Sequence, residues 1–125
     1  MRYLTPNNVI QIHFEIVDAT GGLHGLRDAG LLESAVMRPQ SSFDGEDLYP
    51  TLELKAAALV HSLLLNHMFA DANKRTATVS MIEFLILNGK KFEATNREIV
   101  DFAMWVENKK PTIEEIASWI KKHIS

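Results

Sequence analysis

The chain has 125 residues, of which 46% are hydrophobic and 23% charged, and its formal net charge is −3 at pH 7. These values are ordinary for a folded domain, and we expect one domain over residues 1–125. The negative charge and the lack of a basic block argue against direct nucleic-acid binding. The absence of cysteine excludes disulfides, thiolate metal sites and a cysteine nucleophile.

Membrane and secretion signals are missing from the sequence. Residues 1–6 lack the apolar stretch of a signal peptide. No apolar run approaches the roughly 20 residues needed to cross a bilayer. We therefore expect a cytoplasmic protein with no membrane partner.

The first predicted helix begins at Pro6, after the N-cap residue Thr5, and ends at Gly21-Gly22. His13 lies beside the apolar stripe of this helix. Most such histidines are packing residues with one satisfied nitrogen, and we expect that role. The glycine-rich loop that follows is not a phosphate loop, because no Gly-Lys-Ser/Thr follows it and no strand precedes it.

A short second helix is predicted from the N-cap Asp28 to a stop before Pro39. Its apolar residues are expected to pack inward, with Glu33 and Arg38 as ion-pair partners on the outside. Residues 41–50 form a polar connection, and Thr51 begins the next helix, which runs over 52–65.

The remaining segments also read as helices. Residues 76–87 are apolar nearly all round, which predicts the central helix of the domain, closed by Asn88-Gly89. Capping boxes that begin at Thr95 and Thr112 open two more helices, with Trp105 and Trp119 at their contact. About six helices and no convincing strand predict an all-α fold.

The segment 67–76 concentrates polar chemistry between two apolar helices. Such a cluster is usually a simple helix–helix connection. Lys74 and Arg75, however, stand at the start of a helix, where the macrodipole disfavours cations. Together with the free N–H groups of that first turn they would form a strong anion site. The arrangement predicts a negatively charged ligand, with phosphate as the natural candidate.

This segment reads H-x-F-x-D-A-N-K-R-T, which resembles the signature loop of Fic-domain proteins and, within them, of the death-on-curing (Doc) branch. Met68, Ala72 and Lys74 depart from the general Fic pattern, and the last two match the Doc form. A second stretch, Gly30 to Gln40, resembles the segment before the target-docking loop of Doc-like proteins. The resemblance implies a compact bundle of about six helices, with a short β-hairpin flap at residues 41–50 that holds the target backbone.

Transfer of a phosphate or nucleotide to a hydroxyl needs a base, a divalent cation and donors for the phosphate charge. His67 suits the base and Asp71 suits Mg²⁺. Asn73, Lys74 and Arg75 are expected to hold the phosphates of ATP. The Fic resemblance implies the same roles at these positions. His61, six residues before His67, has the wrong spacing for a shared metal and is expected to be a packing or surface residue.

The resemblance also implies what the protein does. Adenylyl-transferring Fic proteins have glycine at the position of Lys74, whereas lysine there goes with kinase activity in the Doc branch. We therefore expect a toxin that phosphorylates a translation factor of the elongation factor Tu class and so arrests translation. An adenylyltransferase is the alternative enzyme, and a catalytically silent Fic-like binding module is the alternative of another class.

Restraint of such a toxin is expected to come from another chain. Many Fic proteins carry an inhibitory helix of pattern Ser/Thr-x-x-x-Glu-Gly/Asn. Here Glu107 precedes Asn108, but Ala103 stands four residues before it, so no internal inhibitor is predicted. The Doc resemblance implies a Phd-type antitoxin whose tail folds as a helix in an apolar groove.

Overall fold

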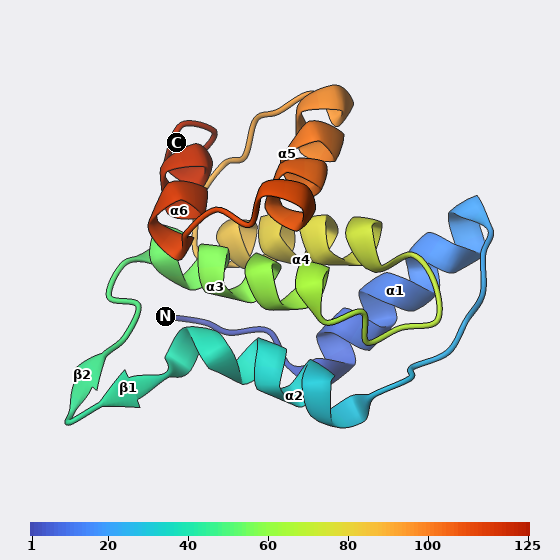
Figure 1. Ribbon diagram of the computed structural model, residues 1–125, viewed down its shortest axis with the longest axis horizontal. Helices are drawn as coiled ribbons and strands as arrows, with labels where there is room; N and C mark the ends of the chain where they lie inside the picture. The colour runs from blue at the N-terminus through green and yellow to red at the C-terminus, as the bar shows by residue number, and fades with distance from the viewer.

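The computed structural model describes residues 1–125 as a helical bundle with one small hairpin (Figure 1). The helices are α1 (Pro6–Thr20), α2 (Ala29–Met37), α3 (Leu52–Leu65), α4 (Asn73–Leu87), α5 (Asn96–Lys109) and α6 (Ile113–Lys121). A short 3-10 helix, η1 (Arg38–Gln40), continues α2, and the strands β1 (Ser42–Phe43) and β2 (Glu46–Asp47) follow it. The predicted all-α fold with a short hairpin is confirmed. No helix is long and apolar enough to cross a membrane.

Side-chain caps define where most helices begin. A hydroxyl or carboxylate oxygen accepts an N–H bond from the first turn of every helix except α4, and these caps belong to Thr5, Asp28, Thr51, Thr95 and Thr112. All five were predicted from the sequence. The helix α4 begins at Asn73, three residues earlier than predicted, and its N-cap Ala72 has a left-handed backbone and no capping side chain.

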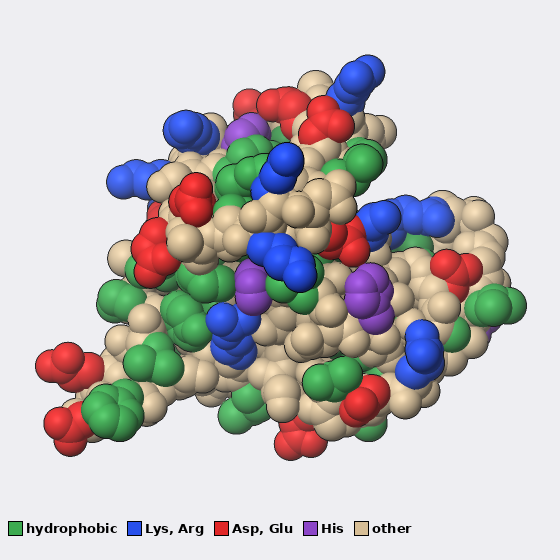
Figure 2. Space-filling view, viewed as in Figure 1, with side chains coloured by type: hydrophobic (Ala, Val, Ile, Leu, Met, Phe, Trp, Pro, Cys, Tyr) green, Lys and Arg blue, Asp and Glu red, His purple; other side chains and the backbone are tan.

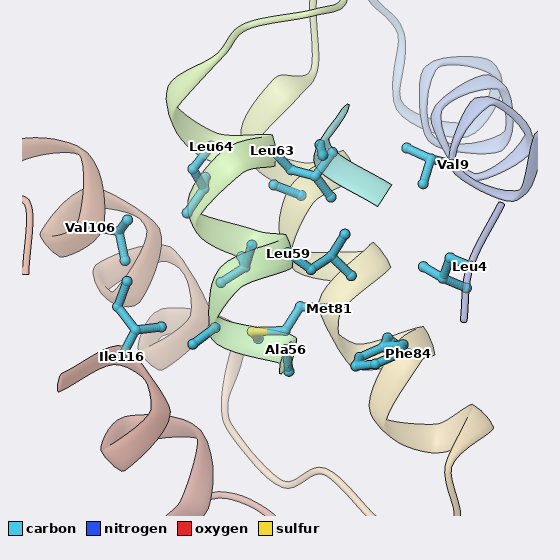
Figure 3. Packing of buried hydrophobic residues seen from close by; sticks show 14 of the residues in the cluster. Leu4, Val9, Ala56, Leu59, Leu63, Leu64, Met81, Phe84, Val106 and Ile116 are labelled. Carbon is cyan, nitrogen blue, oxygen red and sulfur yellow. The ribbon is translucent and has the colours of Figure 1, made fainter. Parts of the chain in front are cut away.

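The central helix is α3. Its residues Lys55–Val60 are all buried, as are three of the next four. Figure 3 shows this helix between Val106 and Ile116 on one side and Met81 and Phe84 on the other. α3 therefore contacts both α4 and the C-terminal helix pair.

The prediction that the helix after the signature loop is the central one is wrong. Val79 and Ile86 of α4 are exposed. The consecutive small residues Ala56–Ala58 of α3 are fully buried, and they let neighbouring helices approach that helix from several sides. A run of alanines carries little hydrophobic periodicity, which is why the sequence pattern ranked the two helices in the wrong order.

An aromatic cluster joins α5 to α6. Phe102 stacks on Trp119 with ring centroids 4.1 Å apart, and Trp105 lies 6.1 Å from Phe102 on a tilted ring plane. The two tryptophans predicted at this contact therefore meet through Phe102.

Arg38 connects η1 to α3. Its Nε donates to the Tyr49 hydroxyl at 3.1 Å, and one guanidinium nitrogen lies 2.9 Å from both Ser62 Oγ and His61 Nδ1. The predicted ion pair with Glu33 is therefore wrong, because Arg38 turns toward α3. His61 is a packing residue as predicted, and burial, with a smaller contribution from Arg38, lowers its pKa.

The hairpin projects from the helical body between η1 and α3 (Figure 1). Its strands are antiparallel, and Asp44 and Gly45 make the turn with positive φ angles of 54° and 81°. All four strand residues are exposed, and Figure 2 shows acidic and hydrophobic side chains on this projection. The hairpin leads into the start of α3, whereas the signature loop follows the end of α3.

Candidate functional site

The signature loop is the part of the 67–76 segment that precedes α4, residues 67–72. It is supported by the glycine-rich segment that follows α1, residues 21–26. Ala70 N–H donates to the Gly25 carbonyl at 3.0 Å, and the N–H groups of Arg27 and Asp28 donate to the Met68 carbonyl at 2.7 and 3.2 Å. The two segments therefore run side by side in an antiparallel arrangement. No strand precedes the glycine-rich segment, and its backbone supports the signature loop through these hydrogen bonds.

Apolar contacts fix the loop to the core. The side chains of Met68 and Phe69 are both buried in the central cluster. The His13 ring stacks on Phe69 with centroids 3.9 Å apart and an interplanar angle of 7°, and His13 Nε2–H donates to the Asp71 carbonyl at 2.9 Å. The predicted packing role of His13 is confirmed, with one ring nitrogen satisfied.

Asn73 holds the loop closed at the start of α4. Its Oδ1 accepts the Phe69 N–H at 3.0 Å, and its Nδ2 donates to the Phe69 carbonyl at 2.9 Å. This pair of hydrogen bonds reproduces the pairing that a neighbouring strand would give. Asn73 thus shapes the loop, and its expected contact with a phosphate stays a prediction.

Asp71 is held as a carboxylate by backbone donors. Its Oδ1 accepts the N–H of Ala72 at 2.8 Å, and its Oδ2 accepts the N–H of Leu23 at 3.2 Å. These two bonds lower the pKa of Asp71, and the bond from Ala72 has the larger effect. The charges of Arg75 and His13 add smaller effects to this pKa in the same direction. An Asp71 that stays ionised is the form that a hard cation requires.

The position of the Asp71 carboxylate requires glycine at residue 22. A Cβ built on Gly22 would lie 2.8 Å from Asp71 Oδ2, and the residue has a φ of +121°. Only glycine therefore lets the loop after α1 reach the carboxylate without displacing it.

A pocket of about 350 Å³ opens at the loop, and four of its charged or titratable side chains are those named from the sequence: His67, Asp71, Lys74 and Arg75. Asn73 and Glu107 also line it. The imidazole of His67 is 57% exposed, and the residue has a φ of +44°. Figure 2 shows basic and acidic side chains side by side where α4 begins.

The two cations at the start of α4 differ in their contacts. Lys74 Nζ lies 3.6 Å from Glu107 Oε1, and its side chain is 60% exposed. Arg75 reaches back to α1 and donates to the Thr20 hydroxyl. Neither cation is neutralised by a strong ion pair, and the first turn of α4 has no capping side chain. The electrostatics favour an anion here.

The donor set fits a magnesium nucleotide better than a metal held by protein alone. No three His, Asp or Glu side chains converge anywhere in the structure to form a metal cage. Mg²⁺ commonly binds through one or two carboxylates together with substrate phosphates and waters. Asp71 can supply that one carboxylate, since each of its oxygens keeps a lone pair beyond the bond it already accepts.

The structure thus brings together all five residues predicted from the motif, and it adds others that the motif did not contain. Gly22 and His13 hold the loop, Thr20 contacts Arg75, and Glu107 lines the pocket from α5. The positive φ at Gly22 leaves a weak trace in the sequence as a Gly-Gly pair. Glu107 leaves none, because it reaches the site only through the packing of α5.

The fold and the pocket define a class of protein: an all-α domain in which a polar loop carrying a histidine and an aspartate connects two helices and lines a pocket. A model of the Fic/DOC family matches residues 3–85, and the chain belongs to this family. The predicted resemblance is confirmed.

Two relatives show how far the similarity extends. The chain is 30% identical over 123 residues to the protein kinase doc of Escherichia phage P1, an alignment that covers 98% of this chain and 95% of that protein. It is 50% identical over 76 residues to the toxin Doc of Mycolicibacterium smegmatis. That second alignment covers 61% of this chain and 58% of the mycobacterial protein, so it spans little more than half the length of that relative.

Proposed function

We propose that this protein is the toxin of a type II toxin–antitoxin system, and that it transfers the γ-phosphate of ATP to a hydroxyl of a translation factor of the elongation factor Tu class. The observation that carries the proposal is the pocket in which His67 and Asp71 face the uncapped start of α4 with its two cations. The names of the two relatives, one a kinase and one a toxin, support it.

In the proposed reaction His67 takes the proton of the target hydroxyl. The hydroxyl oxygen forms a bond to the γ-phosphorus, the bond from that phosphorus to the β–γ bridging oxygen breaks, and ADP leaves. Lys74, Arg75 and the first N–H groups of α4 bind the phosphate oxygens, whose negative charge they stabilise. The loop contacts of Phe69 and Asn73 keep the base and the phosphate site in fixed relation.

Asp71 is the residue that would hold Mg²⁺, and the bound ion would offset charge on the phosphates. The carboxylate is ionised at neutral pH, as an ordinary aspartate is, and the support for this role is its position in the pocket. The same carboxylate accepts the Leu23 N–H, so the loop after α1 sets its direction.

Transfer of AMP is the competing reaction. Lys74 favours phosphate transfer, since its side chain lines the pocket and fills space that a glycine would leave open for close approach of the backbone. A third possibility, a silent binding module, is disfavoured by the presence of all of His67, Asp71 and Arg75 in one pocket.

The experiment uses purified protein, elongation factor Tu, magnesium and ATP labelled either at the γ- or at the α-phosphate. We expect label in the factor only from γ-labelled ATP, and no label with the His67→Ala variant. Label from α-labelled ATP would establish AMP transfer instead. No label from either nucleotide, with growth unaffected when the protein is produced in bacteria, would overturn the toxin proposal.

The proposed partner that restrains the toxin is an antitoxin of the Phd type. A small neighbouring reading frame with an amphipathic C-terminal tail would supply it. We expect co-production of that product to restore growth, and a peptide of its tail to become helical on binding. If the neighbouring product neither binds nor restores growth, this part of the proposal fails while the transferase reaction still stands.

A further inference from the structure

Glu107 is the one carboxylate that enters the pocket from outside the signature loop. It lies on α5, forty residues after His67, and its side chain is 15% exposed. Its Oε2 is 3.8 Å from His67 Nε2, and its Oε1 is 3.6 Å from Lys74 Nζ. A single carboxylate is therefore shared by the proposed base and by the proposed phosphate-binding cation.

Glu107 is incompletely satisfied in this position. Its Oε1 is buried and has no hydrogen-bond partner, and both of its ion-pair distances exceed the length of a hydrogen bond. A buried carboxylate oxygen without a donor costs free energy. Such a group in a native structure calls for an explanation, and a role in the site provides one.

We infer that Glu107 is a positioning residue for His67: it orients the imidazole and stabilises the imidazolium that forms when His67 takes the hydroxyl proton. The inference rests on the proposed function, in which His67 is the base. A base whose ring is held by a carboxylate on a separate element is a recurring arrangement in proton-transferring sites.

Lys74 makes this support depend on the nucleotide. While the pocket holds no phosphate, Lys74 lies near one oxygen of Glu107 and His67 near the other, so the charge of Lys74 offsets part of the negative charge that acts on His67. A phosphate draws Lys74 toward itself, and Glu107 is then left to His67. Phosphate binding would thus strengthen the base at the moment when it is needed.

The charges around His67 come from three parts of the chain. Asp71 belongs to the signature loop, Lys74 and Arg75 to α4, and Glu107 to α5. Asp71 accepts two backbone N–H bonds and Arg75 contacts Thr20. Lys74 and Glu107 are the two that form ion pairs next to His67, with opposite signs, so their removal should have opposite effects.

The test is nitrogen NMR of the His67 ring in the intact, ¹⁵N-labelled protein at a fixed pH near 6.5, where a free imidazole is about half protonated. Glu107→Gln keeps the shape of the side chain and removes its charge. We expect it to lower the ratio of protonated to neutral His67 by about two- to fivefold, the range for a partly exposed ion pair. Lys74→Met should raise the same ratio, and Glu107→Asp should retain part of the effect.

Addition of magnesium ATP completes the experiment. The nucleotide should raise the protonated fraction of His67 in both proteins, because the phosphates themselves favour the imidazolium, and the rise should be smaller in Glu107→Gln. In a transfer assay Glu107→Gln should lower kcat, and KM for ATP should not rise, because the substitution frees Lys74 from the ion pair that a phosphate would otherwise have to break. A His67 signal that is unchanged by Glu107→Gln, or a variant that transfers phosphate faster, would overturn the inference.

The ring measurement in the absence of nucleotide does not depend on which group is transferred. If His67 responds to both substitutions but no phosphate reaches any target, the proposed function fails and the coupling of Glu107 to His67 stands. If phosphate is transferred but His67 ignores Glu107, the proposed function stands and this inference fails.

Discussion

The ring of His13 on α1 stacks on the ring of Phe69 in the signature loop, and the same histidine donates a hydrogen bond to the carbonyl of Asp71. The His13 side chain thus fixes both the Phe69 ring, which anchors the loop to the core, and the backbone of Asp71. The hydrogen bond joins two residues that are 58 positions apart in the sequence. Together the two contacts explain why a histidine, which can both stack and donate, occupies a buried position on an apolar helix face.

Replacing His13 separates its two contributions. His13→Phe keeps an aromatic ring against Phe69 but leaves the Asp71 carbonyl without its donor. We expect the free energy of unfolding to fall by about 1–2 kcal/mol in His13→Phe and by about 2–4 kcal/mol in His13→Ala, which also leaves a cavity. Urea denaturation measures both values. Equal losses in the two variants would contradict a role for the ring stack.

Gly22→Ala should displace Asp71, because the new methyl group would lie 2.8 Å from its Oδ2. Gly21→Ala is the matched control: Gly21 also has a positive φ, of +85°, but no atom lies within 4 Å of its Cβ position. Both variants should lose stability, by about 1 kcal/mol for the control. We expect only Gly22→Ala to weaken the binding of magnesium ATP, as measured by calorimetry. The same weakening in both variants would mean that backbone strain, and not the clash, is responsible.

Asn73→Ala removes both bonds to the Phe69 backbone. We expect a loss of about 1–3 kcal/mol in the free energy of unfolding and faster hydrogen exchange at the Phe69 amide. The amide of Leu54, which Thr51 caps at the start of α3, serves as an internal control and should exchange as before. Unchanged protection at Phe69 would show that the loop closes without Asn73.

The stability of the domain should fall in mild acid through His61. Burial and Arg38 lower the pKa of His61 in the folded protein below the ordinary value of 6.5. At a pH between the folded pKa and 6.5, the unfolded chain therefore binds more protons than the folded one. The free energy of unfolding contributed by this group is therefore fully present above pH 6.5 and is lost as the pH falls through the folded pKa. We expect an effect below about 1 kcal/mol, because His61 is only partly buried.

The variant His61→Asn isolates the contribution of His61 to the pH dependence of stability. Its amide oxygen can still accept a hydrogen bond from Arg38, but the side chain does not titrate. Denaturation curves of both proteins should be recorded at neutral pH and at about pH 5. The difference in unfolding free energy between the two proteins should shift in favour of the variant at the lower pH. If both proteins lose the same amount, His61 is not the source of the acid sensitivity.

Local sequence signals were sufficient for most of the fold. The N-cap residues and capping boxes located the helix starts, and the glycines at positions 21 and 89 marked two of the ends. These features act over three or four residues, so a pattern along the chain contains them. The loop motif likewise carried His67, Asp71 and the two cations, because all lie within nine residues of each other.

Long-range packing was not visible in the same way. The central position of α3 depends on three small alanines whose importance appears only when other helices surround them. The inward turn of Arg38 depends on Tyr49 and His61, which lie on separate segments. Glu107 reaches the pocket only because α5 crosses near the start of α4. In each case the partner is set by tertiary geometry, which no local pattern encodes.

The bare N-cap at Ala72 has a thermodynamic consequence. The left-handed backbone of Ala72 (φ 59°) differs from the extended backbone of the other α-helix N-cap residues, so no side chain at this position folds back onto the first-turn amides, and they stay free for an incoming anion. With no cap at Ala72, the first-turn N–H groups of α4 have no side-chain acceptor until a ligand binds. A bound phosphate would then complete the secondary structure, and the protein should melt at a higher temperature when it is loaded than when it is empty.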